Sequence, residues 1–263
     1  MRIQSPRIAG RALPGSFVHL TCGPELPMRR PMSVMRASPA NGWLDMLFKA
    51  HGKGTRMLSE RRPGDVLSVM GPIGRPFRLA EYRTRPLLIG GGVGIPPMVF
   101  LAEHMKRAAP DVQPLVFMGS EVPFPFSVKP SKILVPEMPS GAIGSMPLLD
   151  DWGIPSRLAS GTGMAGCFEG FVTDLVRAWL DADPTPREDI EIFACGPTPM
   201  LKAVQQLAAD YALPAQISLE EFMACATGGC AGCTVLTQTD AGAAMRRVCV
   251  DGPVFDAADV VLN

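Results

Sequence analysis

The segment RPLLIGGGVGIPPMVFLAEHMKRAAPDVQPLVFMGS, from Arg85 to Ser120, decides the fold class of the central part of the chain. An apolar run leads into a glycine turn, an amphipathic stretch follows, and a second apolar run closes the segment. Strand, helix and strand in this order make a βαβ unit with parallel, buried strands. The stretch IEIFACGPTPMLKAVQQLAADYAL (190–213) repeats the strand, glycine turn and helix. Residues 81–213 are therefore expected to form a doubly wound α/β domain.

The first glycine turn contains Gly91, Gly92 and Gly94. Glycines at the start of a helix let a pyrophosphate approach the backbone, where unpaired N–H groups and the helix dipole favour anions. A glycine turn alone is a weak signal, and a tight connection without a ligand is the alternative interpretation. The turn indicates a nucleotide site.

The second turn is Cys195-Gly196-Pro197, directly after the apolar run EIFA. A lone cysteine at such a place is most often a small buried residue. The alternative is that Cys195 faces a ligand across the carboxyl ends of the strands, where doubly wound sheets bind nucleotides. Both interpretations stay open.

The chain before about Arg78 shows short apolar runs separated by proline, glycine and asparagine, which predicts an antiparallel barrel or sandwich over residues 1–80. Two motifs stand out in it: Arg30-Pro31-Met32-Ser33, and Gly52-Lys53-Gly54-Thr55. The second is expected to open a short helix with Thr55 as its N-cap, a turn that can hold a phosphate. Each motif alone is structural more often than functional. The five prolines of residues 122–145 predict an irregular connection.

Four cysteines gather near the end of the chain as Cys225-x4-Cys230-x2-Cys233, with Cys249 further on. Three thiolates from one loop and a fourth from a distant strand are the plant-ferredoxin arrangement for a [2Fe–2S] cluster. The loop glycines 228, 229 and 232 are expected to take positive φ angles around it. Residues 214–263 are too few to fold by apolar burial alone, so the metal group is expected to act as their core.

A structural zinc site is the alternative for these cysteines. Zinc motifs usually pair their ligands as two separate short knuckles, whereas here three cysteines share one loop. The spacing therefore favours iron and sulfide over zinc.

Composition excludes several classes of partner. The chain has 25 basic and 25 acidic residues among 263, so no net field attracts nucleic acid. No apolar run is long enough for a signal peptide or a membrane span, and seven cysteines fit a reducing compartment. A cytoplasmic protein is expected. The three histidines form no recognisable constellation, and no catalytic acid or base is predicted.

Taken in order along the chain, these motifs resemble the electron-transfer subunits of type B dihydroorotate dehydrogenases, in the ferredoxin-reductase superfamily. The resemblance covers nearly the whole chain. Its most specific part is SLEEFMACATGGCAGC (Ser218–Cys233) together with CVDGPVF (Cys249–Phe255).

The resemblance implies three parts: an antiparallel, N-terminally short FAD-binding β-barrel (1–80), a parallel-sheet NAD-binding domain (81–213) and a small [2Fe–2S] domain (214–263). It places Ser33 near the isoalloxazine and Arg30 near the pyrophosphate. Glu121 stands where the family often has arginine, and a carboxylate there accepts ribose hydroxyls and repels a 2′-phosphate, which favours NAD over NADP. The implied contacts are Arg30, Pro31, Met32, Ser33, Gly52, Gly54 and Thr55 for FAD; Gly91, Gly92, Gly94, Glu121, Cys195, Gly196 and Pro197 for NAD(H); and Cys225, Cys230, Cys233 and Cys249 for the cluster.

The implied function is electron transfer in pyrimidine biosynthesis. Electrons from the FMN of a dihydroorotate dehydrogenase catalytic subunit are expected to pass through the [2Fe–2S] cluster and FAD to NAD⁺. One alternative is an NAD(P)H-dependent ferredoxin or sulfide reductase subunit of the same superfamily. The other is a non-catalytic, zinc-stabilised binding module.

Overall fold

The computed structural model describes residues 1–262, which form two compact units. The first contains Met1–Phe77, Ser218–Phe255 and the chain from Asp259, and the second contains Arg78–Ile217 and Asp256–Ala258. The three-way domain division stays a prediction. The structure adds that the cysteine-rich segment shares its unit with the N-terminal strands.

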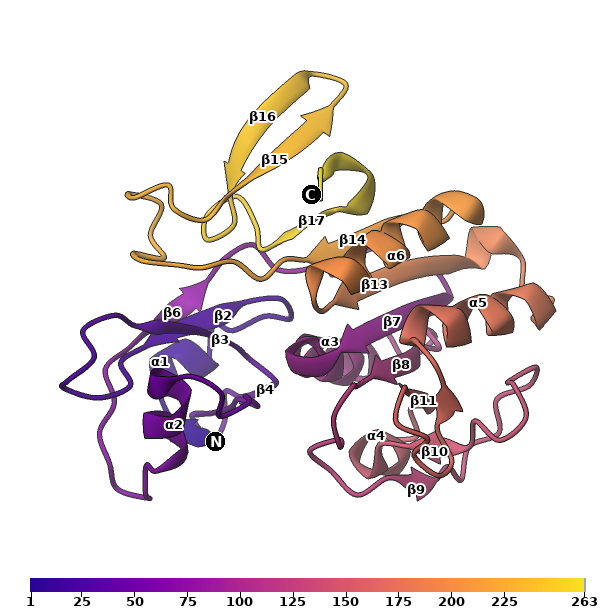
Figure 1. The fold of residues 1–263 in the computed structure, drawn as a ribbon, viewed down its shortest axis with the longest axis horizontal. Coiled ribbons are helices and arrows are strands. Elements are labelled where there is room, and N and C mark those ends of the chain that lie inside the picture. Colours follow the sequence, from indigo (N-terminus) through magenta and orange to yellow (C-terminus); the bar gives the residue numbers. More distant parts are fainter. Residues whose placement is uncertain (263) are drawn as a thin grey trace. The chain divides into compact units, whose positions relative to one another are not determined.

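The first unit carries two three-stranded antiparallel sheets, with strand orders β1-β5-β4 and β3-β2-β6 (Figure 1). Each apolar run of the N-terminal sequence supplies one or two of these strands. The strands are β1 (Arg2–Gln4), β2 (Phe17–Leu20), β3 (Arg30–Ser33), β4 (Arg36–Ser38), β5 (Trp43–Asp45) and β6 (Val69–Ile73), and the helices are α1 (Pro6–Ala9) and α2 (Lys53–Ser59).

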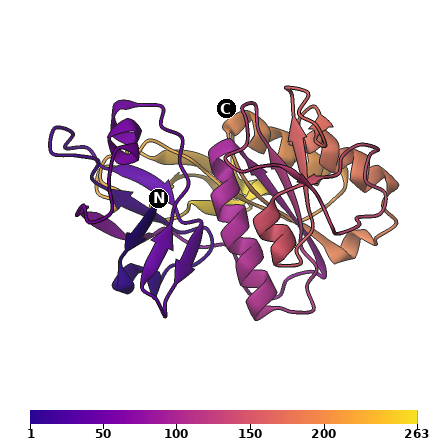
Figure 2. The same ribbon diagram turned by 90° about the horizontal axis from the view of Figure 1, so that it is seen from below.

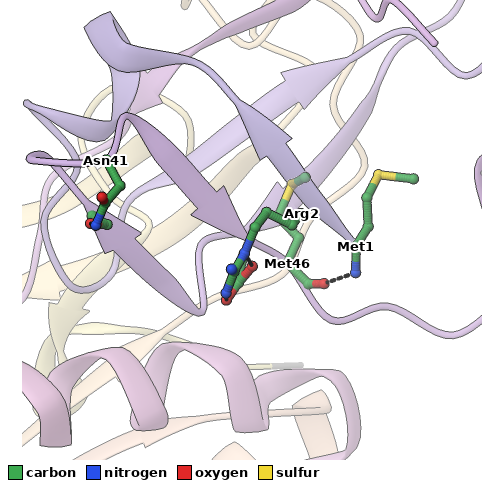
Figure 3. Close-up of polar contacts among 6 residues, drawn as sticks. Met1, Arg2, Asn41 and Met46 are labelled. Carbon is green, nitrogen blue, oxygen red and sulfur yellow. Dashed lines mark hydrogen bonds and ion pairs between the residues drawn. The ribbon is translucent and has the colours of Figure 1, made fainter. Parts of the chain in front are cut away.

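The first residues of the chain are held by β5 (Figure 3). The Met1 ammonium donates to the Met46 carbonyl at 2.8 Å, and Arg2 forms a two-bond ion pair with Asp45. The Arg2 guanidinium also lies 3.8 Å from the centre of the Trp43 ring. The Arg2 side chain is 57% exposed, so these contacts add little to the stability of the fold and mainly fix the register of β1 against β5. One short strand thus precedes β2.

The second unit is built on a parallel sheet, as the βαβ pattern predicts. The strand order of this sheet is β12-β11-β8-β7-β13-β14-β17, and most of β17 consists of residues of the first unit. The helix α3 lies on one face, and α5 and α6 lie together on the other (Figures 1 and 2). The strands are β7 (Arg85–Gly91), β8 (Leu115–Gly119), β11 (Ser156–Ser160), β12 (Phe168–Glu169), β13 (Ile190–Cys195), β14 (Ala215–Ser218) and β17 (Val254–Asp256), and the helices are α3 (Ile95–Ala108), α4 (Pro147–Asp151), α5 (Val172–Ala182) and α6 (Thr198–Asp210).

Burial explains why the central strands read as continuous apolar runs. Leu87, Leu88 and Ile89 of β7 have no exposed surface, since helices cover both faces of the sheet. Phe117 of β8 and Trp179 of α5 are also fully buried, and their rings pack 6.1 Å apart. The glycine turns lie at the carboxyl ends of two of these buried strands, β7 and β13.

The proline-rich connection is irregular, as its composition predicts. Across residues 122–145 the only regular elements are two paired two-residue strands, β9 (Lys129–Pro130) and β10 (Gly144–Ser145). Within residues 1–262 no helix has both the length and the hydropathy that crossing a membrane requires.

The last elements belong to the cysteine-rich segment. The strands β15 (Thr234–Thr239) and β16 (Gly242–Arg247) form an antiparallel hairpin that starts one residue after Cys233 and ends two residues before Cys249. The hairpin therefore determines how the fourth cysteine returns to the loop of the other three.

Candidate functional site: two glycine turns, a basic turn and a cysteine loop

The two glycine turns lie side by side. The strands β7 and β13 are parallel neighbours, with Gly90 opposite Cys195. From β7 the chain moves through α3 to β8 on one side, and from β13 it moves through α6 to β14 on the other. The direction of winding reverses between these two strands, and this is the point at which doubly wound sheets bind nucleotides beyond the strands' carboxyl ends.

Glycine is required at Gly94 because the turns are in contact. A Cβ at Gly94 would lie 2.1 Å from the Cys195 carbonyl oxygen, well inside any real contact. Gly92 differs: it has a φ of +55°, is exposed and faces open space. Gly94 thus lets the turns pack together, while Gly92 is the position that a ligand can approach.

The second turn divides into a buried and an exposed part. Cys195 is 1% exposed, Gly196 is buried, and Pro197 is exposed at the start of α6. Glu121 lies two residues beyond the end of β8 and is exposed. All these positions lie at the carboxyl ends of adjacent strands, so one extended ligand can reach them.

The two basic motifs of the first unit meet next to α2. A Cβ at Gly54, in the first turn of α2, would lie 3.3 Å from Arg30 Nε and 3.0 Å from Cys22 Sγ. The Arg30 guanidinium donates to the carbonyls of Met28 and Arg29, which fixes it against this turn. A planar guanidinium beside the start of a helix suits a phosphate ligand.

The prediction that Thr55 caps α2 is wrong. Gly52 is the N-cap, and Thr55 lies three residues into the helix, where its Oγ1 accepts hydrogen bonds from the N–H groups of His51 and Gly52. The hydroxyl folds back on the turn because a glycine cap has no side chain for that role. Thr55 therefore shapes the turn and points its hydroxyl at backbone.

The remaining residues of the Arg30 motif lie on β3. Pro31 pairs with His19 across the sheet, Met32 is buried and pairs with Val18, and Ser33 is half-buried and pairs with Phe17. Proline cannot donate to a sheet, and here it lies on an outer strand of the three, as expected.

Backbone N–H groups turn toward sulfur in the cysteine loop. Thr227 N and Gly232 N lie 3.4 Å from the Sγ atoms of Cys225 and Cys230, respectively. These bonds need left-handed backbone, which occurs at Ala226 (φ +55°), Gly228 (φ +84°) and Ala231 (φ +52°). The expectation of positive φ at Gly229 and Gly232 is wrong, because the residue that directly follows each of these cysteines makes the turn, and here it is alanine.

The four thiols form two pairs. Cys225 contacts Cys230, and hydrogen bonds led by the Thr227 N–H lower the pKa of Cys225 to about 6. Cys233 and Cys249 meet at the base of the hairpin, where Val248 N donates to the Cys233 carbonyl at 2.9 Å. Burial, and then the Cys233 thiol, raise the pKa of Cys249 to about 11, and a hydrogen bond from the Gly228 N–H opposes that rise.

This donor set fits a two-iron cluster. In residues 1–262 no three His, Cys, Asp or Glu side chains converge on a point that suits a single ion. Two thiol pairs spread along a loop, with N–H groups aimed at sulfur, match the needs of a larger bridged group whose sulfurs accept hydrogen bonds.

The segment after Cys249 packs on the N-terminal strands. Arg75 N donates to the Gly252 carbonyl at 2.5 Å, and a Cβ at Gly74 would lie 2.3 Å from Pro253 Cδ. A Cβ at Gly15 would lie 2.9 Å from Val254. The cysteine loop and the strands of the Arg30 motif are thereby parts of one unit.

Sequence reasoning missed Arg247. Its Nη1 lies 3.3 Å from the Gly228 carbonyl, across the loop from the fourth cysteine. The available signal was its position two residues before Cys249, but only the hairpin shows what it contacts.

Comparison with known proteins gives the family. The family model described as the iron–sulfur cluster binding domain of dihydroorotate dehydrogenase B matches residues 220–261. The dihydroorotate dehydrogenase B (NAD(+)) electron transfer subunit of Desulforamulus reducens is 32% identical over 263 residues, covering 99% of this chain and 91% of its own. The chain belongs to this family. The corresponding subunit of Geobacillus sp. (strain WCH70) is 35% identical, covering 95% of this chain and 87% of its own.

Solved structures agree with the family. The NADH-dependent reduced ferredoxin-NADP oxidoreductase, described for flavin-based electron bifurcation, is 28% identical with a TM-score of 0.76, covering 99% of this chain and 84% of the other. The cytochrome b5 reductase domain of Ulva prolifera nitrate reductase, 18% identical with a TM-score of 0.55 over 77% of this chain and 82% of its own, shows the fold alone. The predicted resemblance and fold class are confirmed, and the predicted electron-transfer function, enzyme class and cofactors agree with the dihydroorotate dehydrogenase B family.

Proposed function

We propose that the chain is the electron-transfer subunit of an NAD-linked dihydroorotate dehydrogenase and carries electrons from an FMN-containing catalytic subunit to NAD⁺. The observation that carries this proposal is the paired cysteine loop within the unit that also holds the Arg30 motif. When bound, a flavin exchanges a hydride with nicotinamide and passes single electrons to an iron–sulfur group. The chain's own residues bind and orient these groups.

The cluster site is assigned to the four cysteines. Their thiolates would hold the iron–sulfur group, which would supply a one-electron carrier, and in the structure Cys225 lies against Cys230 and Cys233 lies against Cys249. The N–H groups of Thr227 and Gly232 donate to the ligand sulfurs, which stabilises negative charge on them. Gly229, Cys230, Ala231 and Gly232 are all exposed, so the loop presents backbone to a docking partner.

FAD is assigned to the first unit. Arg30 pairs with the pyrophosphate, together with the turn of Gly52 and Gly54, whose shape Thr55 maintains. Ser33 lies on β3 and is placed near the isoalloxazine, with Pro31 and Met32 forming the strand beside it. No proton transfer by a side chain is required, since hydride and electron transfer depend on position.

NAD(H) is assigned to the second unit. Gly91, Gly92 and Gly94 receive the pyrophosphate at the start of α3, and Cys195, Gly196 and Pro197 lie by the nicotinamide. The exposed Glu121 accepts the ribose hydroxyls and repels a 2′-phosphate.

A second function is favoured by one observation, the TM-score of 0.76 to the NADH-dependent reduced ferredoxin-NADP oxidoreductase. In that case a ferredoxin replaces the dihydroorotate-oxidising subunit, and the residue assignments are unchanged.

Reconstitution with each partner separates the two functions. The chain is mixed with an FMN-containing dihydroorotate dehydrogenase subunit or with a ferredoxin, and dihydroorotate-dependent NADH formation is compared with NADH-dependent ferredoxin reduction. We expect dihydroorotate to reduce NAD⁺ only when the chain is present, while dye-linked oxidation proceeds without it. Unchanged NAD⁺ reduction without the chain would refute the proposal, and ferredoxin reduction alone would favour the second function.

A further inference from the structure

The β15–β16 hairpin positions only two of the four cysteines, Cys233 and Cys249. Thr234 pairs with Arg247, which places Cys233 and Cys249 beside each other. Residues 225–230 lie outside this ladder and pair with no strand. A second connection is needed to bring Cys225 and Cys230 to the same place.

Arg247 makes that connection. Its Nη1 donates to the Gly228 carbonyl at 3.3 Å, at the turn between Cys225 and Cys230. Gly228 fits closely there, because a Cβ on it would lie 2.7 Å from Val250 Cγ2 and 3.3 Å from Arg247 Nη1. The loop turn therefore packs directly on Arg247 and Val250, which lie two residues before and one residue after Cys249.

Asp251 holds Arg247 in this pose. Its Oδ2 accepts from the Arg247 backbone N–H at 2.8 Å and lies 3.3 Å from Arg247 Nε. The Arg247 carbonyl accepts N–H groups from Val250, Asp251 and Gly252 at 3.1, 2.7 and 3.3 Å. Arg247 thus closes the turn around Cys249 with both its backbone and its side chain. Asp251 is the better buried member of the ion pair, with 18% of its side chain exposed against 41% for Arg247.

Charge gives Arg247 a second effect. Reduction of a bound cluster adds one negative charge, and a neighbouring cation favours the reduced form. The Asp251 carboxylate offsets part of the positive field of Arg247, so the effect of Arg247 on the reduction potential is that of a partly neutralised cation. The planar guanidinium serves both functions because it bonds Gly228 and Asp251 at the same time, whereas a lysine ammonium is a point charge.

We propose that Arg247 is a positioning residue for the iron–sulfur cluster: it clamps the loop of Cys225 and Cys230 to the Cys249 turn and raises the cluster's reduction potential. This inference rests on the proposed cluster site.

Three variants of the full chain test it: Arg247→Met, Arg247→Lys and, as the matched control, Arg246→Met. Arg246 is an exposed arginine on the adjacent position of β16, opposite Val235. The readouts are iron and sulfide per chain, the rate of iron loss to a chelator, and the midpoint potential from an EPR-monitored titration.

For Arg247→Met we expect iron loss several times faster than in the control and a reduced-to-oxidised ratio about tenfold lower at a fixed potential, a shift of about 59 mV. For Arg247→Lys we expect a potential close to the original with iron loss still faster, because charge is kept and the two-sided bond is lost. A wild-type chain without two irons would refute the proposed cluster site itself. If the wild-type chain holds two irons and Arg247→Met matches Arg246→Met in both the rate of iron loss and the midpoint potential, the role of Arg247 is refuted while the cluster site stands.

Discussion

Because the two glycine turns are in contact, we expect Gly94→Ala to force them apart. The added Cβ would lie 2.1 Å from the Cys195 carbonyl oxygen, 2.3 Å from its carbon and 2.5 Å from Gly196 N, all backbone atoms. A carbon and an oxygen approach each other to about 3.3 Å. The turns must therefore separate by about 1.2 Å, and no side chain can rotate away to absorb this.

The expected cost follows from that displacement. Overpacking in a tight core costs about 1–3 kcal/mol, and here the obstacle is rigid backbone, so the upper part of that range applies. A displacement of about 1 Å at a reaction site can lower the rate by about 100-fold. Gly94→Ala should therefore lose both stability and NADH-linked activity, while dye-linked transfer from the cluster side is retained.

Urea denaturation and NADH binding measure the two effects. Gly161→Ala is the matched control, because a Cβ at Gly161 would meet no atom within 4 Å and Gly161 follows β11 at the same edge of the sheet. We expect the control to bind NADH as the original chain does. Equal unfolding midpoints and equal NADH affinities for Gly94→Ala and Gly161→Ala would refute the packing argument.

Three further predictions concern other residues. Burial, with Arg29 nearby, lowers the pKa of the fully buried His19 below its ordinary 6.5. The unfolded chain therefore binds the proton more readily, and the stability of the folded chain should fall as pH drops below about 6.5. The urea midpoints at pH 5 and pH 7.5 should differ less in His19→Phe than in the original chain, and an undiminished difference would contradict this. Glu121→Ala should raise NADPH affinity relative to NADH by about three- to tenfold, measured by titration, and an unchanged ratio would place Glu121 away from the ribose. Cys249→Ser should lower iron content to below half of the wild-type value while FAD content stays, and full retention of iron would exclude Cys249 as a ligand.

Local patterns in the sequence predicted the parallel sheet well. The strand, glycine turn and helix of residues 85–108 follow from hydrophobic period and from glycine, both of which act within a few residues. The cysteine spacing predicted an iron–sulfur site for the same reason, since three of the four cysteines lie within one loop.

Contacts between distant segments were not predictable. The packing of Gly74 against Pro253 joins residues far apart in sequence, and no local pattern indicates that the cysteine-rich segment shares a unit with the N-terminal strands. The bond from Arg247 to Gly228 likewise depends on the hairpin register.

Two errors came from local rules that a competing contact overrode. Thr55 reads as a cap by residue type, but Gly52 takes that position and the hydroxyl turns back to the His51 and Gly52 N–H groups. The left-handed turns fall on Ala226 and Ala231 because hydrogen bonds to the cysteine sulfurs outweigh the preference for glycine.

The central claim is that the four cysteines hold a two-iron cluster that exchanges electrons with the nucleotide site. The most direct test is EPR spectroscopy of the anaerobically purified, FAD-loaded chain before and after addition of NADH, with iron, sulfide and zinc determined on the same sample. The account predicts two irons and two sulfides per chain and an S = ½ signal that develops on addition of NADH. One zinc per chain, with no iron and no signal, would contradict it.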